Sequence, residues 1–190
     1  MINKIAKRVC NSLIKHGTVN SDLEEVYVYG IELLLSFLFS VSLIIAIGFC
    51  AGKTIETLVF LIMFIMIRKF TGGFHASTYL KCQICTISSY LIALHISVEF
   101  ELPIIAKALL IIIGTATVSL IGPIENPNKP IDKESMNRYK TIGTFMFVGF
   151  GIIGLLLSYS LPGISNLMIY ALTLILLLML VSFIGRRIKE

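Results

Sequence analysis

Apolar residues gather along this chain into six long segments that short polar stretches separate. They cover residues 31–50, 54–67, 84–100, 102–121, 142–161 and 164–184. A helix needs roughly 20 residues to cross the hydrocarbon core of a bilayer, and a spanning segment must be helical because lipid offers its backbone no hydrogen bonds. The pattern predicts an all-α, polytopic integral membrane protein with about six transmembrane helices. The second segment has only 14 residues, so we expect a short helix that is tilted, extended into the next polar stretch or re-entrant.

The polar residues 1–29 contain a second pattern. Apolar side chains recur every three or four residues at Ile2, Ile5, Val9 and Leu13, with basic residues between them. This spacing predicts an amphipathic, cytoplasmic N-terminal helix, which either lies on an anionic membrane surface or packs on the protein itself. No apolar core with a small-residue cleavage site follows the early basic residues, so we expect no cleaved signal peptide.

The composition supports the membrane assignment. Of the 190 residues, 56% are apolar and only 14% are charged, compared with about 25% charged residues in average globular chains. A soluble domain of this size would lack the polar side chains that cover a surface. A disordered chain and a secreted disulfide scaffold are excluded by the same composition. We expect a single domain over residues 1–190.

The basic residues alternate in density along the chain. Four Lys or Arg lie in residues 1–29, three in 68–81, four in 122–141 and three in 185–190, whereas the intervening connections have only Lys53 and Lys107 near them. Cytoplasmic loops of membrane proteins carry the excess of Lys and Arg. We therefore expect both termini and the two basic loops to be cytoplasmic. The net charge of +5 is then a topology signal rather than a nucleic-acid patch.

The first basic loop combines a helix break with two reactive residue types. Gly72 and Gly73 end the preceding helix, His75 follows, and Cys82 lies seven residues beyond His75. A Ser-Thr pair between them is a suitable N-cap, which places Cys82 in the first two turns of the next helix. The positive end of that helix and a nearby imidazole or lysine favour the thiolate, the nucleophilic form of cysteine. A histidine beside a thiolate is the catalytic arrangement of cysteine peptidases.

The spacing of these two residues sets a condition. On one straight helix seven residues advance about 10.5 Å, which is too far for a hydrogen bond between His75 and Cys82. A catalytic pair therefore requires the Gly-Gly loop to fold back on the helix. Without that fold-back, His75 is an interfacial polar residue and Cys82 is a small buried hydrophobe.

Cys82 and Cys85 also form a C-x-x-C pattern. Such a pair can be a redox centre, and a membrane thiol–disulfide oxidoreductase is the alternative function. A cytoplasmic position argues against disulfide chemistry, and positions i and i+3 are neighbours on any helix. The sequence contains no second Cys/His pair at zinc-site spacing, so we expect no metal site.

The second basic loop, residues 122–141, contains three prolines within eight residues and four basic side chains: Lys129, Lys133, Arg138 and Lys140. The prolines stiffen the backbone into an extended form. Two interpretations stay open. The loop is a solvated connector that obeys the topology rule, or it is a docking strip for an acidic peptide.

With these residues the sequence resembles the accessory gene regulator B (AgrB) family, the membrane-embedded cysteine endopeptidases of Gram-positive quorum sensing. The resemblance rests on the length, the hydrophobic layout, the Arg68…Gly72-Gly73-Phe74-His75-Ala76…Cys82 stretch and the Pro127…Lys129-Pro130 loop. It implies that His75 and Cys82 are catalytic and that Arg68, Gly72 and Gly73 support the motif. Cys85 matches nothing in the motif.

The resemblance also implies a reaction and its partners. The substrate would be an AgrD-like precursor peptide with an amphipathic leader, a central Cys or Ser and an acidic C-terminal tail. The enzyme would remove the tail, hold the peptide as a thioester on its own cysteine and release a cyclic thiolactone or lactone autoinducer. The basic side chains of the second loop would hold the acidic tail. The family implies the cell membrane of a Gram-positive bacterium and a homodimer, and we expect no cofactor and no nucleic-acid partner.

Overall fold

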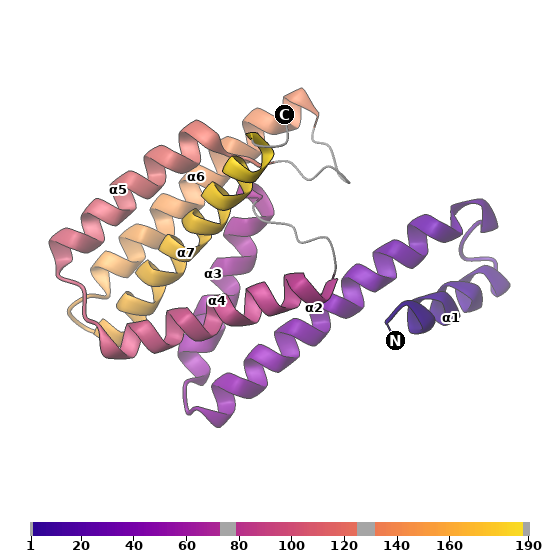
Figure 1. Cartoon of the computed structure of the whole chain (residues 1–190), viewed down its shortest axis with the longest axis horizontal. Helices are drawn as coiled ribbons and strands as arrows, with labels where there is room; N and C mark the ends of the chain where they lie inside the picture. The colour runs from indigo at the N-terminus through magenta and orange to yellow at the C-terminus, as the bar shows by residue number, and fades with distance from the viewer. Residues whose placement is uncertain (1, 73–78, 125–131, 188–190) are drawn as a thin grey trace.

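The computed structural model describes residues 2–72, 79–124 and 132–187, and over these residues it is helical apart from one isolated bridge. A 3-10 turn at Ser21–Leu23 precedes the second of seven α-helices (Figure 1). In chain order these are α1 (Ile2–Lys15), α2 (Glu24–Cys50), α3 (Thr54–Thr71), α4 (Tyr79–Glu99), α5 (Ile104–Ile121), α6 (Lys133–Leu156) and α7 (Pro162–Arg187).

Five helices in the described part of the chain are long and apolar enough to cross a membrane: α2, α4, α5, α6 and α7. The predicted all-α, polytopic architecture is therefore confirmed. The second apolar segment forms α3, which continues into the next polar stretch as far as Thr71 and carries Glu56, Arg68 and Lys69 in its end turns. Because of these charges α3 is not among the five, and the number of crossings stays a prediction.

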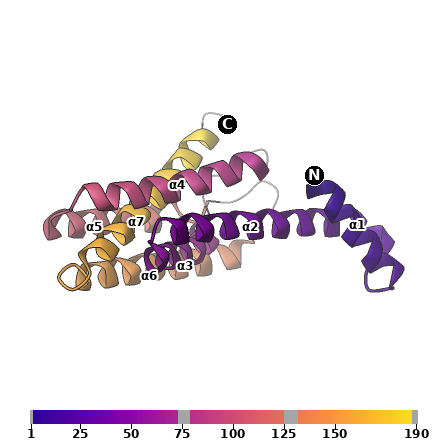
Figure 2. The same ribbon diagram turned by 90° about the horizontal axis from the view of Figure 1, so that it is seen from below.

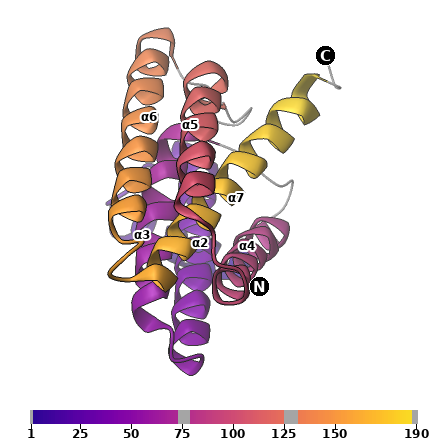
Figure 3. The ribbon, with the colours of Figure 1, turned by 90° about the vertical axis from the view of Figure 1, so that its left-hand side faces the viewer.

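The hydrophobic core is centred on α7, which packs against α3, α4, α5 and α6. Leu172, Ile175 and Met179 of α7 belong to the same buried cluster as Phe60 and Ile67 of α3. The helices α5 and α6 lie side by side along one side of this core (Figure 3). Tight packing between helices is what holds a bundle together in lipid, where no hydrophobic effect operates between them.

The N-terminal helix α1 packs on the first half of α2, and both extend beyond the main bundle (Figure 2). Ala6 and Cys10 of α1 are fully buried in a small cluster with Val28 of α2. The apolar side chains of Ile5 and Val9 stay exposed together with the basic residues of this helix. The amphipathic helix is thus confirmed, with one strip packed on the protein and a second apolar strip beside its basic side chains.

The helix α6 begins nine residues earlier than the apolar pattern predicts, at Lys133 instead of residue 142. Its start is fixed by Asp132, whose carboxylate accepts a hydrogen bond of 2.7 Å from the backbone N–H of Ser135. A side chain that caps a helix in this way satisfies one of the unpaired N–H groups of the first turn. The prediction of a loop up to residue 141 is therefore wrong for residues 133–141, which form a helical extension.

Candidate functional site

Cys82 is the fourth residue of α4, as predicted from the cap signal in the sequence. Its thiol is half-buried and takes part in no disulfide. The first turn of a helix presents unpaired N–H groups and the positive end of the helix dipole. This end of α4 therefore favours negative charge close to the sulfur atom.

Cys82 lines a cavity of about 330 Å³ whose walls come from α2, α3 and α4. Most of its wall is apolar and comes from α2 and α3, with Phe37, Ile44 and Phe64 among the larger side chains. Its polar lining includes Arg68 and Cys82. The cavity is therefore suited to holding apolar groups of a ligand next to a sulfur nucleophile.

Arg68 lies in the last turn of α3, where its guanidinium carbon is 5.3 Å from the centre of the Phe64 ring. Arg68 also lines the cavity of Cys82. Burial among apolar side chains disfavours a charged sulfur atom, whereas a neighbouring cation favours one. Arg68, which the sequence places in the motif, is thus brought to the same cavity as Cys82.

Gln83 is a member of the site that the sequence analysis did not identify. Its Nε2 donates hydrogen bonds to the hydroxyl of Ser36, at 3.0 Å, and to the backbone carbonyl of Ser36, at 3.3 Å. Both residues are buried and both line the cavity. The pair joins α4 to α2 directly beside Cys82, but no sequence pattern links residues that are 47 positions apart.

The two basic loops of the sequence meet where each begins. The backbone N–H of Ile124 donates a 2.9 Å hydrogen bond to the carbonyl of Thr71, and Gly72 pairs with Ile124 in the isolated bridge. Gly72 has φ +69° and ψ −147°, and a Cβ there would collide with the carbonyl of Ile124. The rings of Phe70 and Tyr139 pack edge to face beside this contact, at 5.7 Å between their centres. Gly72 is therefore required by both its conformation and its surroundings.

Three of the predicted site residues lie outside the described part of the chain, and three others lie on α6. Gly73, His75 and Lys129 lie outside the described residues, so the contact between His75 and Cys82 stays a prediction. Lys133 is the first residue of α6. On the same helix Arg138 is exposed and Lys140 is half-buried. These three basic residues therefore follow a helix rather than an extended strip.

Cys85 lies one turn beyond Cys82 and is also a half-buried thiol. The cavity that Cys82 lines does not include Cys85 among the described residues that form its wall. Within the same described ranges, no three His, Cys, Asp or Glu side chains come close enough to hold a metal ion. The two cysteines thus have different surroundings although they are adjacent on the helix.

Comparison with known proteins identifies the family to which the sequence is similar. The sequence matches the family model described as Accessory gene regulator B over residues 4–184. An AgrB-like protein 2 of Clostridium perfringens (strain 13 / Type A) is 22% identical over 84% of this chain and 80% of its own length. An AgrB-like protein of Listeria welshimeri serovar 6b is 21% identical over 78% of this chain and 76% of its own length. No solved structure matches.

Proposed function

Since the chain belongs to the accessory gene regulator B family, which takes part in quorum-sensing peptide processing, we propose that it is a membrane-embedded cysteine endopeptidase. Its substrate is an AgrD-like precursor peptide, from which it removes the C-terminal tail to form a cyclic thiolactone or lactone. The observation that supports this proposal is the cavity that Cys82 and Arg68 both line, which gives a thiol and a basic side chain to one largely apolar binding space.

In the proposed reaction Cys82 is the nucleophile and His75 is the base. The imidazole takes the thiol proton, and the sulfur attacks the carbonyl carbon of the scissile peptide bond. The carbon–nitrogen bond then breaks, and the imidazolium gives its proton to the leaving amine of the tail. The peptide is left as a thioester on Cys82. The central Cys or Ser of the peptide attacks this thioester, its proton passes through His75 to Cys82, and the ring closes as the carbon–sulfur bond breaks.

The cavity helps to explain why ring closure rather than hydrolysis follows. Its wall is mostly apolar, with side chains such as Leu33, Val41 and Leu61. A substrate held there excludes water from the thioester while its own nucleophile is held close to the reacting carbonyl. The apolar leader of a precursor is a natural occupant of such a space. Water therefore competes poorly with the internal nucleophile.

The helical extension of α6 is the proposed site for the acidic tail. Arg138 is exposed on it, and Lys133 and Lys140 lie on the same two turns. The packing of Phe70 on Tyr139 places this extension next to the end of α3. A basic helix next to the end of α3, on which Arg68 also lies, steers an acidic segment toward this end of the molecule. The excess of Lys and Arg at this end also supports a cytoplasmic site in the cell membrane, with both termini inside. We further propose a homodimer.

The proposal is tested by expressing the full chain with a candidate precursor and following cleavage. Cys82→Ser and His75→Ala are each expected to lower the cleavage rate by at least about 10³-fold. Cys85→Ala is the matched control, because it removes a thiol from the same helix one turn away, and it is expected to retain cleavage. Cleavage at the wild-type rate by Cys82→Ser would refute the endopeptidase assignment.

The thiol–disulfide oxidoreductase is the second candidate, and the adjacency of Cys82 and Cys85 on α4 is the observation that favours it. It predicts equal loss of function in both cysteine variants. It also predicts a reversible disulfide between the two residues on thiol trapping. Retained peptide cleavage in Cys85→Ala would separate the two functions in favour of the endopeptidase.

A further inference from the structure

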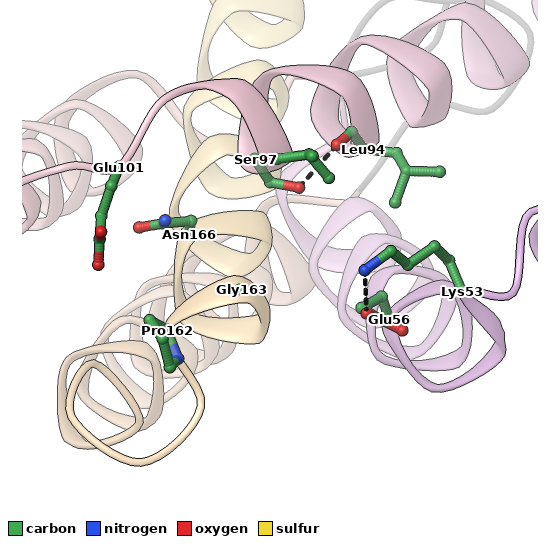
Figure 4. A pocket seen from close by; sticks show the side chains of 9 residues that line it. Lys53, Glu56, Leu94, Ser97, Glu101, Pro162, Gly163 and Asn166 are labelled. Atoms are coloured by element: carbon green, nitrogen blue, oxygen red, sulfur yellow. Dashed lines mark hydrogen bonds and ion pairs between the residues drawn. The ribbon is translucent and has the colours of Figure 1, made fainter.

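A second cavity lies at the opposite end of the bundle from Cys82. Its volume is about 250 Å³, and the start of α3, the last turns of α4 and the first turns of α7 enclose it (Figure 4). Ser97 of α4 lines this cavity, 15 residues beyond Cys82 on the same helix, a separation of roughly 22 Å. None of its lining residues lines the cavity of Cys82. It is therefore a separate place on the molecule.

Asn166 of α7 is the residue that marks this cavity as a binding site. Its side chain lines the cavity and is only 3% exposed. Its Oδ1 atom is buried without a hydrogen-bond partner in the described part of the chain. A buried amide oxygen in this state is costly because it has lost its bonds to water and gained none in return. No donor among the described residues of the cavity wall therefore reaches this oxygen atom.

A buried donor on the adjoining helix α5 already has its hydrogen-bond partners. Lys107 of α5 is 1% exposed, and its ammonium group donates to the hydroxyl of Ser165 at 2.8 Å and to that of Ser158 at 3.3 Å. Ser165 in turn donates to the carbonyl of Gly154 at 2.7 Å. None of these three hydrogen bonds involves Asn166. Lys107 and Ser165 therefore supply no donor to Oδ1 of Asn166.

The charges around the cavity favour a cation. Lys53 and Glu56 form an ion pair of 3.1 Å and so neutralise each other. Glu101 also lines the cavity, and Asn166 extends toward it in Figure 4. In the described ranges Glu101 forms no ion pair, although Lys107 is close enough for an electrostatic interaction with its carboxylate. The last turns of α4 line the cavity and carry no basic residue in the final turn, so no cation of this helix offsets the negative end of its dipole.

We propose that this cavity binds a primary ammonium group, which donates hydrogen bonds to Oδ1 of Asn166 and to the carboxylate of Glu101. An ammonium group offers three N–H donors and a positive charge, which match an unpaired acceptor beside an unpaired acid. The volume of about 250 Å³ is sufficient for a small headgroup. The ligand is a small amine dissolved in water or the amine headgroup of a lipid such as phosphatidylethanolamine.

The first arm of the test uses the full chain in phosphatidylcholine nanodiscs, with ethanolamine as the probe and choline as the control. Ethanolamine is expected to raise the midpoint of thermal unfolding by about 2–4 °C in a saturable manner. Choline has no N–H donor and is expected to leave the midpoint unchanged. Glu101→Gln is expected to weaken the apparent affinity about tenfold. Glu99→Gln removes an exposed acid outside the cavity and is expected to behave as wild type.

Asn166→Leu separates binding from folding. It replaces an unpaired amide with an apolar group of similar shape, so it is expected to keep or raise the unfolding midpoint without amine and to lose the shift with ethanolamine. The second arm measures retention of phosphatidylethanolamine by native mass spectrometry, in wild type and in Glu101→Gln. Retention by wild type alone supports the lipid source, and an ethanolamine shift without lipid retention supports the soluble source. The proposal is overturned if neither arm gives a signal, if choline matches ethanolamine, or if both variants respond as wild type does.

Discussion

Gln83 of α4 holds Ser36 of α2 through one nitrogen atom, which donates to the hydroxyl and to the backbone carbonyl of the same residue. The residue before Gln83 is Cys82, so this link fixes the start of α4 next to the thiol. The two hydrogen bonds are buried, where water does not compete for the donor. The position of the proposed nucleophile therefore depends on a contact to another helix.

Gln83→Leu tests this dependence. It removes both bonds but preserves the size of the side chain. We expect the free energy of unfolding to fall by about 0.6 kcal/mol for each lost interhelical bond and the cleavage rate to fall severalfold because Cys82 is less well placed. Ser36→Ala loses only the hydroxyl partner and should show a smaller effect in the same assays. An unchanged cleavage rate in Gln83→Leu would show that the link does not position the thiol.

Gly72→Ala addresses the contact between the two basic loops. Gly72 has a positive φ, and a methyl group there would meet the carbonyl of Ile124. Gly52→Ala is a matched control, since Gly52 also has a positive φ but has open space around its Cα atom. We expect both substitutions to cost about 1–3 kcal/mol of backbone strain and only Gly72→Ala to lower precursor cleavage. Equal activity of the two variants would argue against a role for the contact.

Arg68 offers a test of charge beside Cys82. Arg68→Ala removes the cation from the cavity wall, and we expect cleavage to fall by at least about tenfold, which corresponds to about 1.4 kcal/mol. Arg68→Lys keeps the charge but lacks the planar group that lies near Phe64, so an intermediate rate is expected. Single-turnover cleavage of a labelled precursor measures both. The same rate for the alanine and lysine variants would mean that the charge is not the relevant property.

Arg138→Glu tests the proposed binding of the acidic tail. Arg138 is exposed on the helical extension of α6, so reversal of its charge should leave folding intact. We expect KM for the precursor to rise about threefold or more with little change in kcat. The difference from wild type should shrink at high salt, because salt screens exposed charges. Lys15→Glu, an exposed basic position on α1, is the control, and an equal rise in KM there would point to general attraction instead.

The buried Lys107 gives a prediction about stability alone. Ser165→Ala removes its closest hydrogen-bond acceptor, at 2.8 Å, and we expect a loss of about 1–3 kcal/mol because a buried charge is left poorly satisfied. Lys107→Met removes the charge itself, and in that background Ser165→Ala should cost much less. A double-mutant cycle on unfolding free energies measures the coupling. Additive losses in the cycle would contradict the hydrogen-bond account.

The hydropathy pattern was sufficient to predict the membrane-spanning helices, because a spanning segment in lipid must be helical to satisfy its backbone hydrogen bonds. It was insufficient at α6, where a cap at Asp132 starts a helix in a basic stretch that carries no apolar signal. The position of Cys82 within the first two turns of α4 could be predicted from the local cap residues. The partners of Gln83 and Lys107 did not, because each lies on a different helix and only the packing of the bundle brings them together.

The hydrogen bond between Thr71 and Ile124 has a practical consequence for exchanging parts between relatives. Thr71 and Ile124 form a joint between two basic segments of the chain, which follow these two residues in the sequence. A chimaera that transplants only one of these segments would place a foreign end beside a native one at the joint. Swaps intended to change peptide specificity should therefore move the two segments together, with the joint itself left intact.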